Sequence, residues 1–379
     1  MLKKFLLKKN NMPQAQETIV EIDLTALQHN FEYLKSRINS KTKMLAVVKA
    51  FGYGSEPTII AKHLEKLKVD YFAVAYVSEG VALRNAGIMS PILVLHPQKI
   101  NFETLIDRCL EPNLYNAKVL NAFIAVAEEK NQTNYPIHLK FNTGLNRLGF
   151  WENDVDYIID KLKNAPQIKV KTLFSHLAAS EDLNERDFTL NQIDSFKSIA
   201  KEFTLKIGYE PMLHQLNTSG ILNYANEAQF DMVRAGIGLY GFANDLKITS
   251  KLKNVINLKS VISQIHLIEK GETVGYNRAF QATEFMKTAT IPIGHADGIH
   301  RAFGNGKGYV TINEKKAPIV GNVCMDMIMV NITNIDCEEG DEVIVFNSQK
   351  NINDLAEKAN TISYEILTAI SQRIKRIVK

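Results

Sequence analysis

Residues 44–67 read MLAVVKAFGYGSEPTIIAKHLEKL, an apolar run that leads through a glycine-containing turn into an amphipathic stretch. The run Met44–Val48 is short, apolar and rich in valine, which is typical of a buried strand. In Pro57–Leu67 apolar residues recur three and four positions apart, which indicates a helix with one buried face. The stretch therefore predicts one β/α unit, with Lys49 at the end of its strand.

The same alternation continues from about residue 43 to residue 236. Helical patterns such as Ala117–Lys130, Val155–Lys163 and Leu190–Phe203 stand between short β-like runs. Eight strands, each followed by a helix or a short helical turn, predict a (β/α)8 barrel, although a doubly wound open sheet shares this alternation. The eight runs are Met44–Val48, Tyr71–Ala75, Ile92–Leu95, Asn113–Tyr115, Ile137–Phe141, Val170–Ser175, Met212–Leu216 and Met232–Arg234.

After about Ala243 the pattern changes to strands separated by turns that contain Gly or Asn. Helical segments near Asn353–Lys358 and Tyr364–Ile374 follow these strands. This pattern predicts a second, mainly β domain. Its expected strands are Val255–Ile268, Thr288–Ile293, Tyr309–Ile312, Ala317–Val320, Met325–Ile332 and Glu342–Phe346.

The domain organisation that we expect has three parts. Residues 1–16 form a disordered basic tail, residues 17–245 the N-terminal barrel, and residues 246–379 the C-terminal β domain. The stretch Ile19–Leu24 precedes the barrel but is itself strand-like, so we expect that it can pair with the β domain.

Composition excludes several classes of protein. The chain is 45% hydrophobic and 23% charged, which is typical of a globular protein with a sizeable core. Its 45 basic and 41 acidic residues are scattered, so no nucleic-acid footprint is expected. Three cysteines favour a reducing compartment over a disulfide framework, and no apolar run is long enough for a membrane span or a signal peptide. We therefore expect a cytoplasmic protein.

Lys49 is the first candidate for chemistry. Catalytic groups of a barrel lie at the C-terminal ends of its strands, and Lys49 ends the first one. Partial desolvation there lowers the pKa of an amine and makes it a better nucleophile, as a lysine that bonds to an aldehyde cofactor requires. By itself the pattern also fits a structural lysine that extends its ammonium group into solvent.

Segments in both domains carry a family resemblance. The run Ala46–Gly54 (AVVKAFGYG) is followed in order by Lys140–Gly149 (KFNTGLNRLG), Phe174–His176 (FSH), His214–Thr218 (HQLNT) and Met232–Gly241 (MVRAGIGLYG). Together with these, segments of the second domain resemble those of the alanine racemases, which use pyridoxal 5'-phosphate. These segments are Val274–Tyr276, Ile291–Gly294, Ala296–Gly298, Val323–Asp326 and Ser363–Glu365.

The resemblance implies a cofactor site. Lys49 would hold pyridoxal phosphate. The hydroxyl group of Thr218 and the backbone N–H groups of Gly236 and Ile237 follow the last two barrel strands, where such barrels bind phosphate. Arg234 would donate to the pyridine nitrogen, because a guanidinium has no acceptor, and this would limit transamination. The other implied cofactor ligands are Tyr53, His176, Asn217 and Tyr364. Taken singly, these residues also have structural explanations. Thr218 could cap a helix, Tyr53 and Tyr364 could be packed in the core, and Arg234 could form a salt bridge.

The resemblance also implies how racemisation occurs. One base removes the α-proton from one face and a second returns it to the other. These bases would be Lys49 and Tyr276, the latter from the partner subunit of a homodimer. Arg147, Met325 and Asp326 would bind the substrate, and Lys140 would be carbamylated. No metal is implied. Taken singly, Tyr276 also fits a packed aromatic residue and Lys140 an ordinary strand lysine.

Four residues depart from the family pattern. Asn142 replaces Asp, Leu145 replaces Met, Thr218 replaces Ser, and His295 replaces a Tyr that lines the entrance of the active site. The resemblance places Glu181 and Arg301 at the same entrance. Because His295 changes this entrance, the resemblance implies the reaction type but leaves more than one substrate range open.

The resemblance therefore predicts an isomerase that interconverts L-alanine and D-alanine, as in the supply of D-alanine for cell walls. The alternative is a racemase of broader specificity, for serine or lysine, on the same scaffold. A decarboxylase of the related barrel-plus-β class is a further alternative, but this sequence does not contain the signature segments of those decarboxylases. A non-catalytic pyridoxal-phosphate-binding protein would be a single barrel of roughly half this length.

Overall fold

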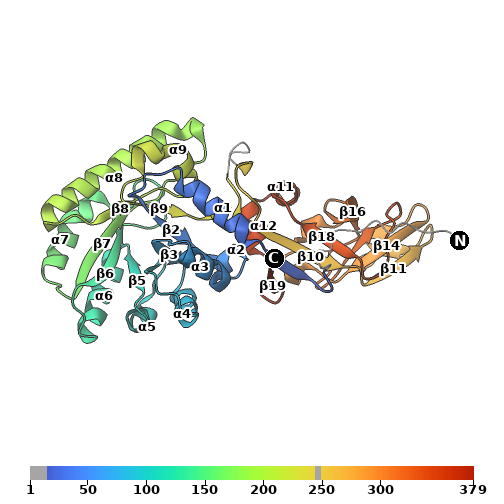
Figure 1. Cartoon of the computed structure of the whole chain (residues 1–379), viewed down its shortest axis with the longest axis horizontal. Coiled ribbons are helices and arrows are strands. Elements are labelled where there is room, and N and C mark those ends of the chain that lie inside the picture. The colour runs from blue at the N-terminus through green and yellow to red at the C-terminus, as the bar shows by residue number, and fades with distance from the viewer. Residues whose placement is uncertain (1–14, 244–248) are drawn as a thin grey trace. The chain divides into compact units, whose positions relative to one another are not determined.

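The computed structural model describes residues 15–243 and 249–379, which form two compact units (Figure 1). Of the described residues, one unit contains 23–243 and 249–255, and the other combines 15–22 with 256–379. Of the tail expected over residues 1–16, residues 1–14 lie outside the described part of the chain.

The first unit is a closed barrel of eight parallel strands. Each strand pairs with the next, and β9 pairs back onto β2, with Met232 beside Lys43. This closure confirms the predicted barrel and excludes the doubly wound open sheet. The strands are β2 (Lys43–Val47), β3 (Tyr71–Val74), β4 (Ile92–Val94), β5 (Glu111–Leu114), β6 (Tyr135–Lys140), β7 (Ile168–Phe174), β8 (Met212–His214) and β9 (Met232–Ala235).

Helices surround the barrel in Figure 1 and bury their apolar stripes against it. In α7, for example, Val155, Ile158 and Ile159 are buried at the spacing that the sequence predicts. Helix α8 is longer than expected and ends where Gly208 adopts a left-handed φ of 83°. The helices are α1 (Leu24–Lys35), α2 (Lys49–Tyr53), α3 (Pro57–Lys66), α4 (Val77–Asn85), α5 (Phe102–Asp107), α6 (Ala117–Glu129), α7 (Val155–Lys163), α8 (Arg186–Ile207) and α9 (Thr218–Ala228).

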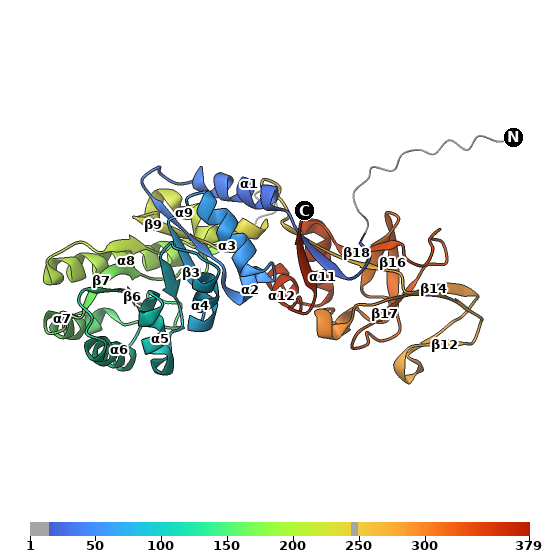
Figure 2. The ribbon, with the colours of Figure 1, turned by 60° about the horizontal axis from the view of Figure 1, so that its bottom comes forward.

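The second unit is built on a nine-stranded sheet (Figure 2), with the order β11-β14-β17-β16-β15-β18-β10-β1-β19. A separate pair, β12 and β13, forms a small hairpin. The strands are β1 (Ile19–Ile22), β10 (Ile256–Val261), β11 (Gln264–Ile268), β12 (Thr273–Val274), β13 (Phe280–Gln281), β14 (Met286–Ile291), β15 (Tyr309–Ile312), β16 (Lys315–Val320), β17 (Ile328–Asn331), β18 (Glu342–Phe346) and β19 (Lys375–Val378), with helices α11 (Gln349–Lys358) and α12 (Ser363–Thr368).

Strand β1 pairs antiparallel with β10 and parallel with β19, which confirms that the strand-like start of the chain joins the β domain. The expected strand Val255–Ile268 is instead two strands. The break falls at Ile262 and Ser263, whose N–H groups bond to Asp341 and Thr290 in different neighbouring segments. Strand β19 was not expected.

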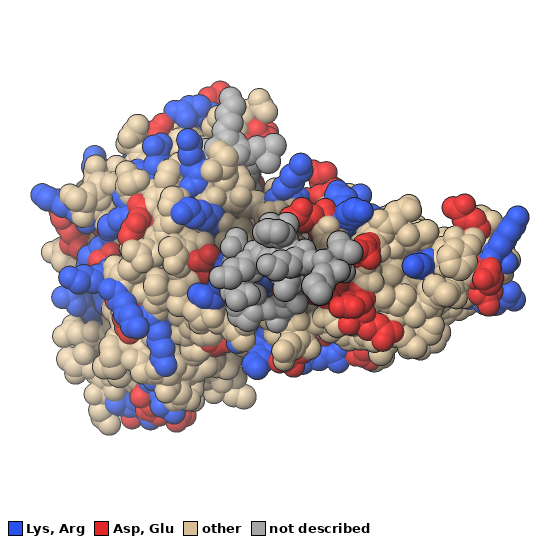
Figure 3. Space-filling model, turned by 45° about the vertical axis from the view of Figure 1, so that its right-hand side comes forward, with Lys and Arg blue, Asp and Glu red and all other residues tan. Residues whose placement is uncertain are grey.

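The surface carries both signs of charge. On the face shown in Figure 3, basic and acidic side chains are interspersed. Within residues 15–243 and 249–379, no helix has the length and apolar character that crossing a membrane requires.

Candidate active site

Lys49 is separated from the end of β2 by Val48 alone, and it begins a left-handed turn. The φ angles of Ala50, Phe51, Gly52 and Tyr53 are 54°, 54°, 61° and 53°. Three of these residues have side chains, and such a conformation costs about 1–2 kcal/mol for each residue that has a Cβ atom. Other contacts must therefore hold this turn in place.

Glu79 on α4 provides those contacts. Its Oε1 atom accepts a hydrogen bond of 2.7 Å from the backbone N–H of Ala50. Its Oε2 atom accepts from the N–H groups of Ala75 (2.7 Å) and Tyr76 (3.1 Å) at the end of β3. One carboxylate thus ties the turn after Lys49 to the neighbouring strand. Glu79 was not among the predicted residues, although an acidic residue in the first turn of a helix is a known capping signal.

The surroundings of Lys49 favour a neutral amine. The residue is half-buried at the C-terminal end of its strand. Burial and the nearby Arg147 lower the pKa of Lys49, whereas Glu79 acts to raise it. A lowered pKa increases the fraction of free amine that can attack a carbonyl or accept a proton.

Arg234, at the end of β9, is buried and surrounded by acceptors. Its Nη1 atom donates to Nδ1 of His214 at 2.6 Å and to the carbonyl of His214 at 3.2 Å. Its Nη2 atom donates to the carbonyls of Ser175 and Gln215, both at 2.7 Å, and to Nδ1 of His176 at 3.0 Å. Within the described part of the chain, the Nε–H group has no acceptor, so one donor of this fixed fork stays available.

Burial, and then Arg147, lowers the pKa of Arg234 to about 9, so its guanidinium is still charged at neutral pH. The half-buried His176 lies beside it. Burial and Arg234 hold the pKa of His176 far below its usual value, so this imidazole is neutral. Since Arg234 can only donate, Nδ1 of His176 is an acceptor and the proton is on Nε2.

An anion-binding arrangement lies at the start of α9. The N-cap residue Asn217 accepts from the N–H of Gly220 at 2.8 Å, and Thr218 is the first helical residue. The Thr218 hydroxyl accepts from the N–H groups of Gly236 (3.1 Å) and Gly238 (3.2 Å). Helix N-termini and nearby backbone N–H groups favour phosphate.

Tyr53 and Gly236 approach each other closely in this region. A Cβ atom on Gly236 would lie 2.8 Å from the Tyr53 hydroxyl, so only glycine allows this approach. The ring of Tyr53 stacks on Tyr240 at a centroid distance of 4.6 Å, and Ile237 is buried next to Gly236. The structure thus brings Tyr53, Asn217, Thr218, Gly236 and Ile237 together at the end of the barrel strands.

Lys140 ends β6 as a buried lysine, with 6% of its surface exposed. Its environment is cationic. Burial, Arg147, Arg234 and Lys49 together lower its pKa to about 7. No ion pair to Lys140 occurs among the residues that the structure describes, so the amine lacks the anion that a buried lysine normally requires.

Arg147 is exposed in the loop that follows β6. Asn142, which replaces the family Asp, closes this loop: its Oδ1 accepts from the N–H of Asn146 and its Nδ2 donates to Oδ1 of Asn146, both at 2.9 Å. A carboxylate could make the first bond but not the second. The replacement of the family Asp by Asn142 therefore removes a negative charge and adds a hydrogen bond between the side-chain amides of Asn142 and Asn146. These bonds order the loop next to Arg147.

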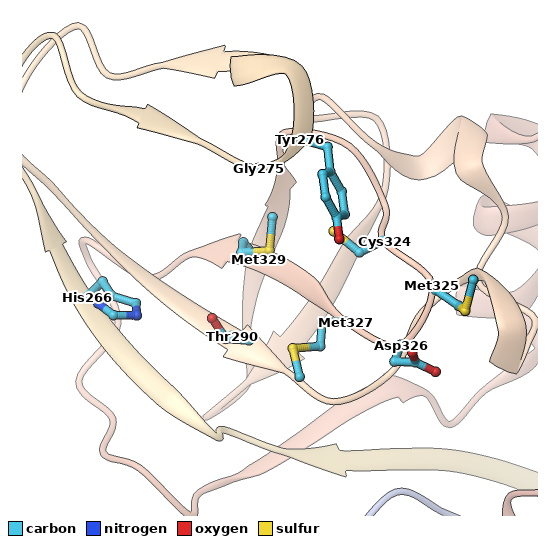
Figure 4. Close-up of a pocket in the computed structure, with 9 residues that line it drawn as sticks. All are labelled: His266, Gly275, Tyr276, Thr290, Cys324, Met325, Asp326, Met327 and Met329. Atoms are coloured by element: carbon cyan, nitrogen blue, oxygen red, sulfur yellow. The ribbon is translucent and has the colours of Figure 1, made fainter.

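Other predicted residues lie in the β domain around a pocket of about 540 Å³ (Figure 4). Tyr276 is 73% exposed and Met325 is 59% exposed, and Asp326 lines the same pocket. Met325 and Asp326 belong to a turn closed by the Cys324 N–H and the Met327 carbonyl, so β17 begins later than expected, at Ile328. The structure thus brings Tyr276, Met325 and Asp326 together.

Arg373 fixes the loops beside this pocket. Its Nε and Nη2 atoms donate to Asp297 at 2.6 and 2.9 Å, and Nη2 also donates to Asp326 at 2.6 Å. Asp297 is buried at the end of the turn that begins with the exposed His295. The His295 N–H bonds to Cys324, so His295 and Asp326 stand on loops held by one arginine. Sequence reasoning missed Arg373.

The remaining predicted residues are distributed over both units. Arg301 is exposed and opens a short 3-10 helix in the β domain. Tyr364 is half-buried on α12 of the same unit. Glu181 is exposed in the loop after β7 of the barrel. Among the described residues, no group of three or more His, Cys, Asp or Glu side chains is arranged to hold a metal ion.

Comparison with known proteins agrees with both units. Residues 22–244 match the alanine racemase N-terminal domain, and residues 255–378 match the alanine racemase C-terminal domain. The chain belongs to the alanine racemase family. It is therefore an enzyme of the isomerase class.

Relatives in this family match the chain over nearly its full length. Alanine racemase 2 of Caldanaerobacter subterraneus is 33% identical over 373 residues, covering 96% of this chain and 95% of its own. An alanine racemase structure from Clostridium difficile has a TM-score of 0.90 at 32% identity, covering 98% of this chain and 97% of its own. A Bartonella henselae alanine racemase with covalently bound pyridoxal phosphate has a TM-score of 0.85 at 29% identity, covering 96% of this chain and 100% of its own.

Proposed function

We propose that this protein interconverts L-alanine and D-alanine with pyridoxal phosphate held by Lys49. The observation that carries the proposal is the charge arrangement at the C-terminal end of the barrel. A lysine with a lowered pKa, a buried arginine with a free Nε–H and a helix N-terminus belong to the same unit. The relative from Bartonella henselae that holds pyridoxal phosphate covalently supports this choice of cofactor.

The residues fit the three functional parts of this cofactor. The Lys49 amine suits its aldehyde. The Nε–H of Arg234 suits the pyridine nitrogen, which can only accept. The start of α9 and the close approach at Gly236 suit its phosphate. When bound, pyridoxal phosphate bonds to the substrate amine and withdraws electrons from Cα, which makes the α-proton acidic.

Arg234 would limit how strongly the ring of a bound cofactor withdraws electrons. Because a guanidinium donates and does not give up its proton, it would leave the pyridine nitrogen unprotonated. Arg234 is held rigidly by three carbonyl groups and two histidines, so it cannot turn away. We infer that this rigid donor favours return of the proton to Cα over transamination.

Two residues would move the α-proton. Lys49 accepts or returns it at Nζ on one face of Cα, and Tyr276 does so at its phenolic oxygen on the other. Tyr276 is largely exposed in its own unit, which is consistent with a residue that serves the partner subunit of a homodimer. Arg147 would bind the substrate carboxylate, and Met325 and Asp326, which line the pocket with Tyr276, would complete the site.

Lys140 would be carbamylated. Its pKa of about 7 leaves a neutral amine that can attack carbon dioxide, forming a carbamate and releasing one proton. The product is an anion among Arg147, Arg234 and Lys49, where the unmodified ammonium would be repelled. The carbamate would then hold Arg147 toward the substrate.

Borohydride reduction of the purified enzyme tests the cofactor assignment. Peptide mapping should place one pyridoxyl group on Lys49, and Lys49→Ala should carry none. Exposed Lys43, at the start of the same strand, supplies the control: Lys43→Ala should be labelled like the wild type. A label on another lysine, or a protein that takes up no cofactor, would contradict the proposal. A chirality assay with L-alanine, L-serine and L-lysine then identifies the substrate.

A further inference from the structure

A chain of buried hydrogen bonds runs through the inside of the barrel and ends at Arg234. Nε2 of His138 lies 2.7 Å from Oε2 of Glu111, and Nδ1 of His138 lies 2.7 Å from Oγ1 of Thr172. The same Thr172 hydroxyl lies 3.0 Å from Nε2 of His214, whose Nδ1 lies 2.6 Å from Arg234. Glu111 is 6% exposed, and His138, Thr172 and His214 are fully buried.

The two ends of the chain fix the direction of every bond. Arg234 can only donate, so Nδ1 of His214 accepts and its proton is on Nε2. Burial and Arg234 keep the pKa of His214 far below its usual value, so this ring is neutral. Nε2 of His214 therefore donates to Thr172.

Glu111 fixes the other end. Burial acts to raise its pKa, but hydrogen bonds from His138 and Lys171 and the charge of Lys171 lower it, so Glu111 is a carboxylate that only accepts. It also accepts from the Tyr71 hydroxyl at 2.7 Å and from Lys171 at 2.9 Å. Nε2 of His138 must therefore donate to Glu111.

Thr172 decides the charge of His138. Its hydroxyl accepts from His214 and has one proton left to donate. If His138 is neutral, its Nδ1 atom accepts that proton and every group in the chain is satisfied. If His138 were a cation, both of its nitrogens would donate to their partners. The proton of the buried Thr172 hydroxyl would then have no acceptor among the described residues. Such an unsatisfied group costs about 1–3 kcal/mol.

We propose that Glu111, His138 and Thr172 are positioning residues that hold Arg234, through His214, in a fixed orientation toward the cofactor ring. No carboxylate among the described residues forms an ion pair with Arg234. This series of hydrogen bonds, which we call the relay, therefore connects the Arg234 cation to the Glu111 anion. The polar groups between them are His214, Thr172 and His138, and each polarises the next. The hydrogen-bond direction does not depend on a bound cofactor, whereas its role in racemisation rests on the proposed function.

The direction is tested by ¹⁵N NMR of the purified enzyme labelled on its histidine nitrogens, with His138→Gln used to assign signals. We expect neutral His138 and His214, each with its proton on Nε2. A cationic His138, or a proton on Nδ1 of either ring, would overturn the relay. This readout does not need a bound cofactor, so it stays valid even if the protein takes up no pyridoxal phosphate.

The positioning role is tested by substitutions at Thr172. Thr172→Val removes the link at nearly constant volume, and Thr172→Ser restores the hydroxyl. Thr189→Val is the matched control, because Thr189 is equally buried and its hydroxyl has no hydrogen-bond partner among the described residues. We expect Thr172→Val to lower kcat about tenfold with little change in KM.

Thr172→Ser should recover most of the kcat, and Thr189→Val should keep the wild-type value. Thr172→Val should also change the absorption spectrum of the bound cofactor, because the orientation of Arg234 becomes less fixed. Equal losses in Thr172→Val and Thr189→Val, no rescue by Thr172→Ser, or an unchanged kcat in Thr172→Val would each overturn the positioning role.

Discussion

Oε1 of Glu79 accepts a hydrogen bond of 2.7 Å from the N–H of Ala50, the residue directly after Lys49. The other oxygen of the same carboxylate binds two N–H groups at the end of β3. Because Ala50 lies in a left-handed turn that few L-residues adopt, this carboxylate determines where the Lys49 backbone lies as well as the charge near its amine.

We therefore expect Glu79→Gln to weaken the turn. The amide keeps one acceptor oxygen but places an NH2 group against a backbone N–H, which should lower the free energy of unfolding by about 1–3 kcal/mol. Removing the carboxylate also removes the interaction that raises the pKa of Lys49, so this pKa should fall further. Denaturant unfolding measures the first effect, and the pH dependence of pyridoxal phosphate uptake by the cofactor-free enzyme measures the second. Ser78→Ala is the control, because Ser78 is exposed on the same helix. Equal unfolding curves for the two variants would argue against a role of Glu79 in holding the turn.

Arg234→Lys tests the proposed role of Arg234 as a rigid donor to the pyridine nitrogen. Lysine has no planar fork and no Nε–H, so we expect racemisation to slow by about a hundredfold and transamination to increase. Arg84 offers a matched control, because its guanidinium also caps backbone carbonyls, at Ile88, Ser90, Arg108 and Cys109. Arg84→Lys should reduce stability without changing the ratio of racemisation to transamination. If Arg234→Lys leaves this ratio unchanged, Arg234 has only a structural role.

Lys140 predicts a specific dependence of stability on pH. Burial lowers its pKa from 10.5 to about 7 in the folded state, so between these values the unfolded chain binds more protons. Above about pH 10.5 the amine is neutral in both states, and Lys140 does not lower the free energy of unfolding. As the pH falls from about 10.5 to about 7, the unfolded chain takes up a proton that the folded chain does not, and the free energy of unfolding decreases. Lys140→Met removes this decrease.

In buffer free of carbon dioxide, Lys140→Met should gain stability relative to the wild type as the pH falls, by up to about 1.4 kcal/mol per pH unit. Below about pH 7 the difference should be constant. Denaturant unfolding at several pH values measures it. Bicarbonate should change only the wild type, whose intact mass should increase by one carbon dioxide. A difference that does not vary with pH would contradict the lowered pKa.

How far the sequence predicts this molecule depends on whether the signal is local. The apolar run Met44–Val48 and the buried stripe of α7 can each be recognised within about ten consecutive residues. Because the other barrel strands give the same kind of local signal, all eight could be predicted. Strand β19 could not, because Lys375 and Arg376 make it polar, and it is a strand only through its pairing with β1. The break at Ile262 likewise depends on distant partners.

The site shows the same division. The family motifs predict Lys49, Thr218 and Arg234 as site residues, but the groups that bind to Arg234 and to the turn after Lys49 lie elsewhere in the sequence. Glu79 reaches Ala50 from 29 residues away, and Glu111 reaches His138 from 27 residues away. Only polar residues within apolar strands, such as His138 in YPIHLK, give a hint, because such residues need a buried partner.

His295→Tyr tests the departure at the proposed entrance. His295 is exposed on a short 3-10 helix, so the larger phenol should be tolerated and stability should change by less than about 0.5 kcal/mol. We expect the variant to use serine and lysine less well relative to alanine, because the ring fills more of the entrance. Ratios of kcat/KM for the three amino acids measure this. An identical profile would show that His295 does not influence specificity.

Mixed dimers test whether Lys49 and Tyr276 act from different subunits. Lys49→Ala should lack the cofactor bond, and Tyr276→Phe should keep it, and each should nearly abolish racemisation. In deuterated water, Tyr276→Phe should still exchange the α-proton of D-alanine through Lys49, while exchange into L-alanine collapses. Equal exchange of both enantiomers would contradict two bases on opposite faces.

Subunit mixing then separates the two possible arrangements. If Tyr276 serves the partner, a heterodimer of Lys49→Ala and Tyr276→Phe has one complete site and one site that lacks both residues. Random mixing makes half of the dimers mixed, so activity should recover to about a quarter of the wild type. If Tyr276 served its own subunit, every site would lack one base and mixing would restore nothing. The double variant Lys49→Ala/Tyr276→Phe, mixed with either single variant, is the control, because no dimer then has a complete site. Mixed dimers that form but stay inactive would therefore show that the two bases do not come from different subunits.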